Sequence, residues 1–318
     1  MRSIIRMAGA AALALACGGA LAQNLSIATG GTGGVYYPLG GGLGAVLSKA
    51  IPGVNATAEV TGGSVANLQL VGTGKPYIAF TQADAAIDAV KGTDKFTGKP
   101  IPVRALAVLY PNRMHVVSIE GTGVAKIADI KGKRVSTGSG GSATEVFAFR
   151  VIEAAGLDKD KDMRRERLGV AESVAALKDK KIDAFFWVGG LPTGAVTDLA
   201  NTPGVTIKMI DIAHLVPEMA KKHGNIYIKD VIPQRMYKGM TADNQAATVT
   251  NLLAVHASMD DKTAYTITKT MFENVVDLVR VHAEAVNIKL ENQKSENSSI
   301  PWHPGAIKFY AEKGIKIK

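Results

Sequence analysis

The sequence contains one cysteine among 318 residues, Cys17, close to the amino terminus. If that segment is removed, the remaining chain has no disulfide, no thiol nucleophile and no cysteine-based metal site. Beyond this segment, no apolar run reaches the length needed to cross a bilayer. These two absences exclude a disulfide-stapled scaffold and predict a mature chain that lies outside the membrane.

The first 22 residues have the features of an export signal. Arg2 and Arg6 supply positive charge, the apolar run 7–16 is too short for a membrane span, and Ala20-Leu21-Ala22 is a small-x-small cleavage site. We therefore predict that residues 1–22 are a signal peptide and that the mature protein is periplasmic. An uncleaved membrane anchor, or a lipoprotein cut before Cys17, are the alternatives.

The motifs of nucleotide-binding proteins are missing. The glycines at 31, 33 and 34 approach a G-x-G-x-x-G fingerprint, but Tyr36 occupies the place of its last glycine. The acidic residue that such a site also needs is not missing, because Glu59 ends the second predicted strand. Neither glycine-rich stretch contains the Gly-Lys-Ser/Thr of a phosphate loop. The sequence therefore disfavours a dinucleotide or nucleotide cofactor.

Hydrolase and metal motifs are missing as well. Gly140 and Ser142 begin a nucleophile elbow, but the final glycine is Thr144. The six histidines are scattered and form no H-E-x-x-H, and the acidic run 158–162 lacks the glycine and the final glutamate of a calcium loop. We expect a protein that is not an enzyme and has no cofactor or metal.

The formal net charge is +9, and removal of Arg2 and Arg6 lowers it to +7. Positive residues in the run 158–167 alternate with acidic ones, which is typical of a solvated surface. No basic stripe is interleaved with aromatic residues, so nucleic acid is not an expected partner. An exported protein with excess positive charge can concentrate anionic ligands.

Two glycine-rich turns with the same construction are present. Residues 30–40 follow a short apolar strand and precede a helix with Leu43, Val46 and Leu47 at helical spacing. Residues 137–144 likewise lie between a strand and a helix. Each turn directs backbone N–H groups and the positive end of a helix dipole toward one point, which suits an anion. We interpret them as two halves of one site; two unrelated turns are the alternative.

Strands and helices alternate along the chain, which predicts an α/β fold with a mainly parallel sheet. Ligands bind beyond the carboxyl ends of the strands of such sheets. An apolar strand 103–110, an interruption at 111–113 and a second run 114–119 predict a first crossing between two lobes, and 249–256 predicts a return strand. The predicted lobes are 23–112 plus 257–318 and 113–256.

Several short stretches in fixed order carry a resemblance to a known family. They are 29–38, 61–67, 82–84, 129–135, 138–144, 189–192 and 300–306. In these stretches the chain resembles the TAXI family, the solute-binding subunits of one class of TRAP transporter, over 27–313. The resemblance implies a type II periplasmic-binding-protein fold, with two α/β lobes, two crossing strands and a ligand cleft between the lobes.

The resemblance also implies a ligand and partners. The ligand would be a small organic anion such as glutamate, 2-oxoglutarate or a similar dicarboxylate, and the partner an integral-membrane TRAP permease. We expect a monomer without nucleic-acid partners. The main alternative is a sensory module that reports its ligand to a membrane histidine kinase.

The positions of these motifs in the family imply ligand contacts from both lobes. Arg113 and His115, near the crossing, are candidates for a second carboxylate or for a surface ion pair at the hinge. Trp187 is expected either to stack on the ligand or to pack in the core. The other predicted contacts are Gly33, Gly34, Val35, Tyr36, Ser64, Asn67, Gln82 and Asp84 in the first lobe and Ser139, Ser142, Ala143, Thr144, Gly190 and Pro192 in the second.

Overall fold

The computed structural model describes residues 23–317, so the predicted signal peptide lies outside the described residues. The strands of this part are β1 (Gln23–Ala28), β2 (Val54–Glu59), β3 (Tyr77–Gln82), β4 (Val103–Ile119), β5 (Arg134–Ser136), β6 (Arg164–Glu166), β7 (Ala184–Gly189), β8 (Ile207–Met209), β9 (Ile228–Ile232) and β10 (Asn244–His256). The α-helices are α1 (Tyr36–Ala50), α2 (Ser64–Val71), α3 (Ala83–Lys91), α4 (Ala143–Ala154), α5 (Val170–Lys178), α6 (Gly194–Asn201), α7 (Val216–His223), α8 (Asp261–Glu273), α9 (Val275–Val281) and α10 (Pro304–Glu312).

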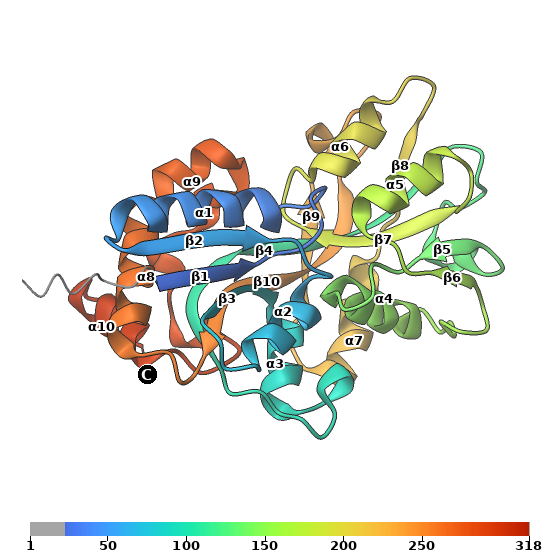
Figure 1. Ribbon diagram of the computed structural model, residues 1–318. Coiled ribbons are helices and arrows are strands. Elements are labelled where there is room, and N and C mark those ends of the chain that lie inside the picture. Colours follow the sequence, from blue (N-terminus) through green and yellow to red (C-terminus); the bar gives the residue numbers. More distant parts are fainter. Residues whose placement is uncertain (1–22, 318) are drawn as a thin grey trace, which may run out of the picture.

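All the strands of the described chain belong to one twisted sheet of order β2-β1-β3-β10-β4-β7-β5-β6, with β8 beside β4 and β9 beside β10. The strands β1, β2 and β3 are parallel at one end, and β5, β6 and β7 are parallel at the other. The two antiparallel strands β4 and β10 lie between them and join a first lobe to a second lobe (Figure 1).

Helices cover both faces of the sheet in each lobe. In the first lobe α1 and α9 lie on one side and α2 and α3 on the other, and α8 and α10 close its outer end (Figure 1). In the second lobe α5 and α6 lie on one side and α4 and α7 on the other. Within 23–317, no helix is long and apolar enough to cross a membrane.

The strand β4 differs from its prediction because it is continuous across Pro111–Arg113. A proline in a central strand removes a ladder hydrogen bond, so it is normally confined to edges and bulges. Pro111 lies opposite Thr250, where the register between β10 and β4 shifts before Leu252. The irregular pairing accommodates the missing N–H, and the strand continues instead of breaking.

Two further elements have an irregular course. The helices α8 and α9 meet at Asn274, whose backbone is non-helical (φ −122°, ψ 23°). Its side-chain amide donates to the Thr270 carbonyl at 2.8 Å, which satisfies a helix-terminal carbonyl at the break. Residues 225–240 include the short strand β9, which pairs with the first half of β10.

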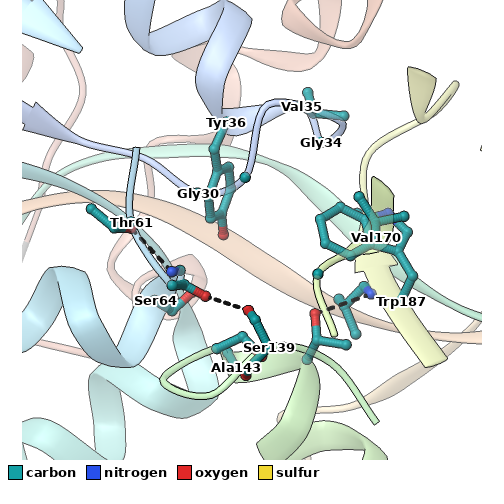
Figure 2. A pocket seen from close by; sticks show the side chains of 18 of the residues that line it. Gly30, Gly34, Val35, Tyr36, Thr61, Ser64, Ser139, Ala143, Val170 and Trp187 are labelled. Atoms are coloured by element: carbon teal, nitrogen blue, oxygen red, sulfur yellow. Dashed lines mark hydrogen bonds between the residues drawn. The ribbon is translucent and has the colours of Figure 1, made fainter. Parts of the chain in front are cut away.

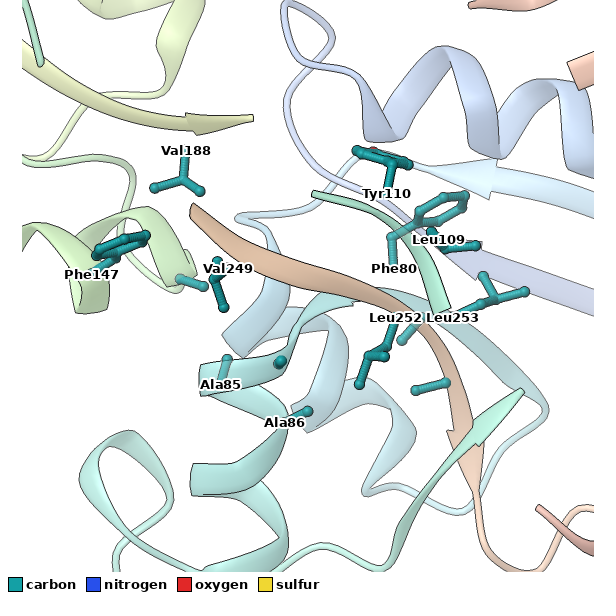
Figure 3. Packing of buried hydrophobic residues seen from close by; sticks show 14 of the residues in the cluster. Phe80, Ala85, Ala86, Leu109, Tyr110, Phe147, Val188, Val249, Leu252 and Leu253 are labelled. Carbon is teal, nitrogen blue, oxygen red and sulfur yellow. The ribbon is translucent and has the colours of Figure 1, made fainter. Parts of the chain in front are cut away.

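The hydrophobic core is continuous through the crossing strands. Phe80 of β3 and Leu252 of β10 are buried in the first lobe, and Phe147 and Val188 are buried in the second. All four belong to one packed cluster, which runs past Val249 on β10 (Figure 3). The crossing strands are therefore anchored by packing on both sides of the boundary between the lobes.

We propose a lobe boundary within β10, near Thr250, rather than after His256. Asn251–Val255 already pair with β3 of the first lobe, whereas 244–248 pair with β9 of the second lobe. The pairing partners of β4 place its lobe boundary at Pro111–Arg113, because its pairing with β7 of the second lobe begins at Arg113.

Candidate functional site

A cavity of about 350 Å³ lies between the two lobes, at the carboxyl ends of the parallel strands. In the first lobe it is lined by Gly30, Gly31, Gly34, Val35, Tyr36, Val60, Thr61, Gly62, Gly63, Ser64 and Gln82. In the second lobe and at the crossing it is lined by Asn112, Ser139, Ser142, Ala143, Thr144, Arg167, Leu168, Gly169, Val170, Glu172, Trp187, Val188 and Gly189.

Four helices begin at this cavity, two from each lobe. Tyr36 is the first residue of α1, Ser64 of α2, Ala143 of α4 and Val170 of α5, and all four line the cavity (Figure 2). The first N–H groups of a helix have no partner within it, and the helix dipole makes its amino terminus positive. The convergence of four such ends creates a region of positive potential suited to an anion.

The lobes touch around the cavity through backbone atoms of the glycine-rich turns. The Ser139 hydroxyl donates to the Gly62 carbonyl at 2.8 Å. The Ala66 N–H donates to the Gly141 carbonyl at 3.0 Å, and the Ala195 N–H donates to the Gly33 carbonyl at 3.2 Å. These contacts join the first lobe to the second on two sides of the cavity, which is the arrangement of a closed cleft.

Glycine is required where the lobes approach most closely. A Cβ on Gly62 would lie 2.6 Å from the Gly140 carbonyl oxygen, and a Cβ on Gly34 would lie 2.8 Å from the Trp187 ring. Neither distance is compatible with a side chain unless the lobes move apart. The glycines of the first lobe therefore let the backbone come close to the second lobe, in addition to shaping the turns.

The floor of the cavity includes a polar network on the crossing strands. The Tyr36 hydroxyl donates to Asn251 Oδ1, and Asn112 Nδ2 donates to the same oxygen at 2.7 Å. Burial raises the pKa of Tyr36 well above its usual value, so its phenol stays protonated. Tyr36 thus ties the first helix to both crossing strands.

Two amide oxygens near this floor lack a partner. Gln82 Oε1 and Asn112 Oδ1 are buried without a hydrogen bond, and both residues line the cavity. A buried polar atom left unpaired is costly, and such atoms are uncommon in native proteins. Both oxygens can therefore accept a hydrogen bond from a donor group placed in the cavity.

Arg167 brings positive charge to the second-lobe side. Its Nε donates to Glu145 Oε1 at 2.8 Å, and Glu145, which is 1% exposed, also pairs with Arg165 (3.1 Å) and with Lys95 of the first lobe (3.2 Å). One carboxylate is shared by three cations. The cluster therefore retains positive charge beside the beginning of α4.

Most of the predicted contacts are brought together by the fold. Gly34, Val35, Tyr36, Ser64, Gln82, Ser139, Ser142, Ala143, Thr144 and Trp187 all line the one cavity. Gly33 does not line it, but its carbonyl accepts the hydrogen bond from Ala195 described above. The two glycine-rich turns therefore face each other, as the two halves of one site require.

Asn67 and Asp84 lie behind the cavity instead of lining it. The Asn67 amide donates to the carbonyls of Thr29 (2.6 Å) and Phe80 (2.8 Å), which ties α2 to the ends of β1 and β3. Asp84 is fully buried and accepts a hydrogen bond from the Tyr227 hydroxyl at 2.8 Å; burial raises its pKa. Both residues hold the framework of the site.

Arg113 and His115 point away from the cavity. Arg113 Nε lies 2.9 Å from Asp230, and a second guanidinium nitrogen lies 3.7 Å from Glu284, which is an ion-pair arrangement beside the crossing. His115 is buried, and its ring nitrogens lie 2.9 Å from the Arg113 carbonyl and from the Tyr237 hydroxyl. Burial lowers the pKa of His115 to about 4, so its ring is neutral near pH 7.

Gly190 and Pro192 lie just beyond the cavity wall. A Cβ on Gly190 would lie 2.8 Å from Glu284, and the Pro192 carbonyl is 3.1 Å from His282 Nε2. The Leu191 N–H between them donates to Glu284 Oε2 at 2.6 Å. This loop of the second lobe is thus attached to the carboxyl-terminal segment of the chain.

Sequence reasoning missed some lining residues. Arg167 stands in the mixed-charge run that predicted a solvated surface, and its side chain is 54% exposed despite its place at the cavity. Asn112 was assigned to an interruption between strands. Gly169 and Val170 begin α5 without a glycine-rich motif, so only their position after β6 could have indicated them.

Solved structures share this architecture. MatC from Rhodopseudomonas palustris with bound malate has a TM-score of 0.59 and 11% identity, over 91% of this chain and 97% of that one. A binding-protein component of an ABC phosphonate transporter from Pseudomonas aeruginosa has a TM-score of 0.51 and 13% identity, over 84% and 80%. The fold is that of the two-lobed periplasmic binding proteins, as the sequence predicted.

The family follows from the sequence match. The model of the NMT1-like family matches residues 27–314, which is nearly the whole described chain, and the protein belongs to this family. The narrower resemblance to the TAXI proteins stays a prediction.

Proposed function

We propose that this protein is an exported solute receptor that binds a small organic anion between its lobes and delivers it to a membrane permease. The observation that carries the proposal is the convergence of four helix amino termini, two from each lobe, on one closed cavity. An anion held by both lobes would stabilise the closed state, so capture and closure would be the same event.

The finer assignment comes from the sequence resemblance. A TAXI-type TRAP permease would be the membrane partner, and glutamate, 2-oxoglutarate or a related acid would be a candidate ligand. The bound anion would be held by charge-assisted hydrogen bonds from backbone N–H groups and hydroxyls. The proposed contacts are those predicted residues that line the cavity, with Arg167 and the Gly62–Gly63 turn added.

The proposed function is ligand binding without a chemical reaction, and the residues around the cavity agree with it. Its titratable side chains include no histidine or cysteine, and no group of three or more metal-ligating side chains occurs within 23–317. The hydroxyls of Ser139 and Ser142 donate to the backbone carbonyls of Gly62 and Ser139, so neither donates to a base that would activate it.

Mass spectrometry of ligand released from purified protein tests the proposal, followed by a thermal-shift screen of organic acids. We expect a small anion to be released and the same anion to raise the melting temperature. Stabilisation by neutral sugars or metal ions alone would contradict the proposal.

A further inference from the structure

The two sides of the cavity differ in chemistry. Thr61, Ser64 and the Tyr36 hydroxyl lie on one side, next to the beginnings of α1 and α2, whereas Val170 and Trp187 lie on the other (Figure 2). Leu168 and Val188 also line the cavity. One side therefore offers hydroxyl groups next to two helix beginnings, and the other, where α5 begins, presents mainly apolar side chains.

Trp187 presents its ring rather than its N–H group to this space. Its indole Nε1 donates to Thr193 Oγ1 at 2.9 Å, so the donor is already used within the second lobe. The ring packs closely against Gly34, where an added Cβ would lie 2.8 Å from it. An indole fixed in this way is suited to contact with an apolar or planar part of a ligand.

The charged side chains at the cavity can pair with one anionic group of a ligand. Among the described residues that line it, the charged side chains are Arg167 and Glu172. Arg167 lies next to Gly140, on the turn that precedes α4, and Glu172 lies next to Gly169. Arg113 and His115, the candidates for a second carboxylate, are occupied outside the cavity. Glu172 stands in the first turn of α5, so a second carboxylate at that helix end would meet a like charge, and elsewhere on this side it would face apolar side chains without a cation to pair with it.

We propose that the ligand is a small monocarboxylate with an apolar body. Its carboxylate contacts the beginnings of α2 and α4 near Ser64 and Ala143, and its apolar body lies against Trp187 and Val170. This inference rests on the proposed function and narrows the ligand class, because it excludes the dicarboxylates that the sequence resemblance suggested.

Three compounds of equal chain length distinguish a monocarboxylate ligand from a dicarboxylate or an uncharged one. Hexanoate has one carboxylate, adipate has two and hexanamide has none. Binding is measured by calorimetry on extensively dialysed protein, and by fluorescence of a Trp302→Phe variant. Trp302 is buried in the first lobe against Tyr310, so this variant leaves Trp187 as the single tryptophan. A Trp187→Phe variant, which keeps Trp302, is the matched control.

We expect hexanoate to bind at least tenfold more tightly than adipate and hexanamide, and to change the emission of Trp187 but not that of Trp302. Equal or tighter binding of adipate would overturn this inference and leave the proposed function intact. Equal binding of hexanamide would overturn both, because no anion would be needed. Failure of all three to bind would overturn the inference, and the charge of the ligand released from purified protein would then decide the proposed function separately.

Discussion

The hydroxyl of Ser139 donates a hydrogen bond to the carbonyl oxygen of Gly62 at 2.8 Å, and this bond joins the Gly62–Gly63 turn of the first lobe to the glycine-rich turn 137–144 of the second. Gly140, the neighbour of Ser139, approaches Gly62 so closely that no side chain fits at position 62. The closed cleft thus depends on two turns that are far apart in the sequence and meet at backbone distance.

Replacement of Gly62 with Ala should weaken ligand binding without loss of folding. The added Cβ would lie 2.6 Å from the Gly140 oxygen only when the lobes are closed, so the open state is unaffected. We expect about a tenfold loss of affinity, equivalent to about 1.4 kcal/mol, in calorimetry. Gly41→Ala is the control, because an added Cβ there meets no atom within 4 Å. Equal affinities for the two variants would exclude close approach of the turns in the bound state.

Arg167→Gln should reduce anion affinity by about tenfold at low salt, and by less at high salt, because the removed charge lies beside the anion site and is partly exposed. Arg164→Gln, at an exposed position on the strand β6 that precedes Arg167, should leave affinity unchanged. The measurement is calorimetry at two ionic strengths. If the affinity depends on salt in the same way in both variants, Arg167 does not contribute to the anion site.

Arg150→Met should destabilise the fold by about 3 kcal/mol, because it leaves the partly buried Asp88 and the buried Asp84 without their cation. Arg150 of the second lobe is 7% exposed and lies 2.6 Å from Asp88 of the first lobe, and it donates to the Tyr227 hydroxyl at 2.8 Å. Urea unfolding measures the loss. The double variant Arg150→Met, Asp88→Asn should recover part of it, and Arg280→Met, at an exposed ion pair, should cost less than about 0.5 kcal/mol.

His115 should make stability fall in mild acid. Burial lowers its folded-state pKa to about 4, below the usual 6.5, so the neutral ring stabilises the fold fully above pH 6.5, and this stabilisation decreases as the pH falls toward 4. From these two pKa values, the contribution of His115 to the free energy of unfolding falls by about 2 kcal/mol between pH 7.5 and pH 5. Burial also lowers the pKa values of His223, His282 and His303, so part of the acid-induced loss is common to every variant. Urea unfolding at both pH values should show a loss about 2 kcal/mol larger in the wild-type protein and in His214→Gln, an exposed control, than in His115→Gln. An unchanged loss in His115→Gln would contradict the burial effect.

The two glycine-rich turns could be predicted from sequence because each is a local pattern: a strand, a turn and a helix beginning. Their placement at one cavity follows from the rule that ligands bind at the carboxyl ends of parallel strands, and Tyr36 and Ser142, which line the cavity from the two turns, both obey it. The contact between Gly62 and Gly140 is a long-range relationship, and no local pattern indicates it.

The candidates on β4 illustrate why side-chain direction was harder to predict. Successive residues of a strand point to opposite faces, so Arg113 and His115 share one face while Asn112 takes the other. The prediction of an interruption at Pro111 concealed this alternation. Asn112 consequently lines the cavity, whereas Arg113 pairs with Asp230 and the neutral His115 ring contacts the Tyr237 hydroxyl.

A crystal structure of the protein with bound hexanoate tests the central claim most directly. The account predicts one carboxylate within about 3 Å of backbone N–H groups at the beginnings of both α2 and α4, and an apolar chain against Trp187. A carboxylate bound by one lobe alone, or outside the cavity between the lobes, would contradict it.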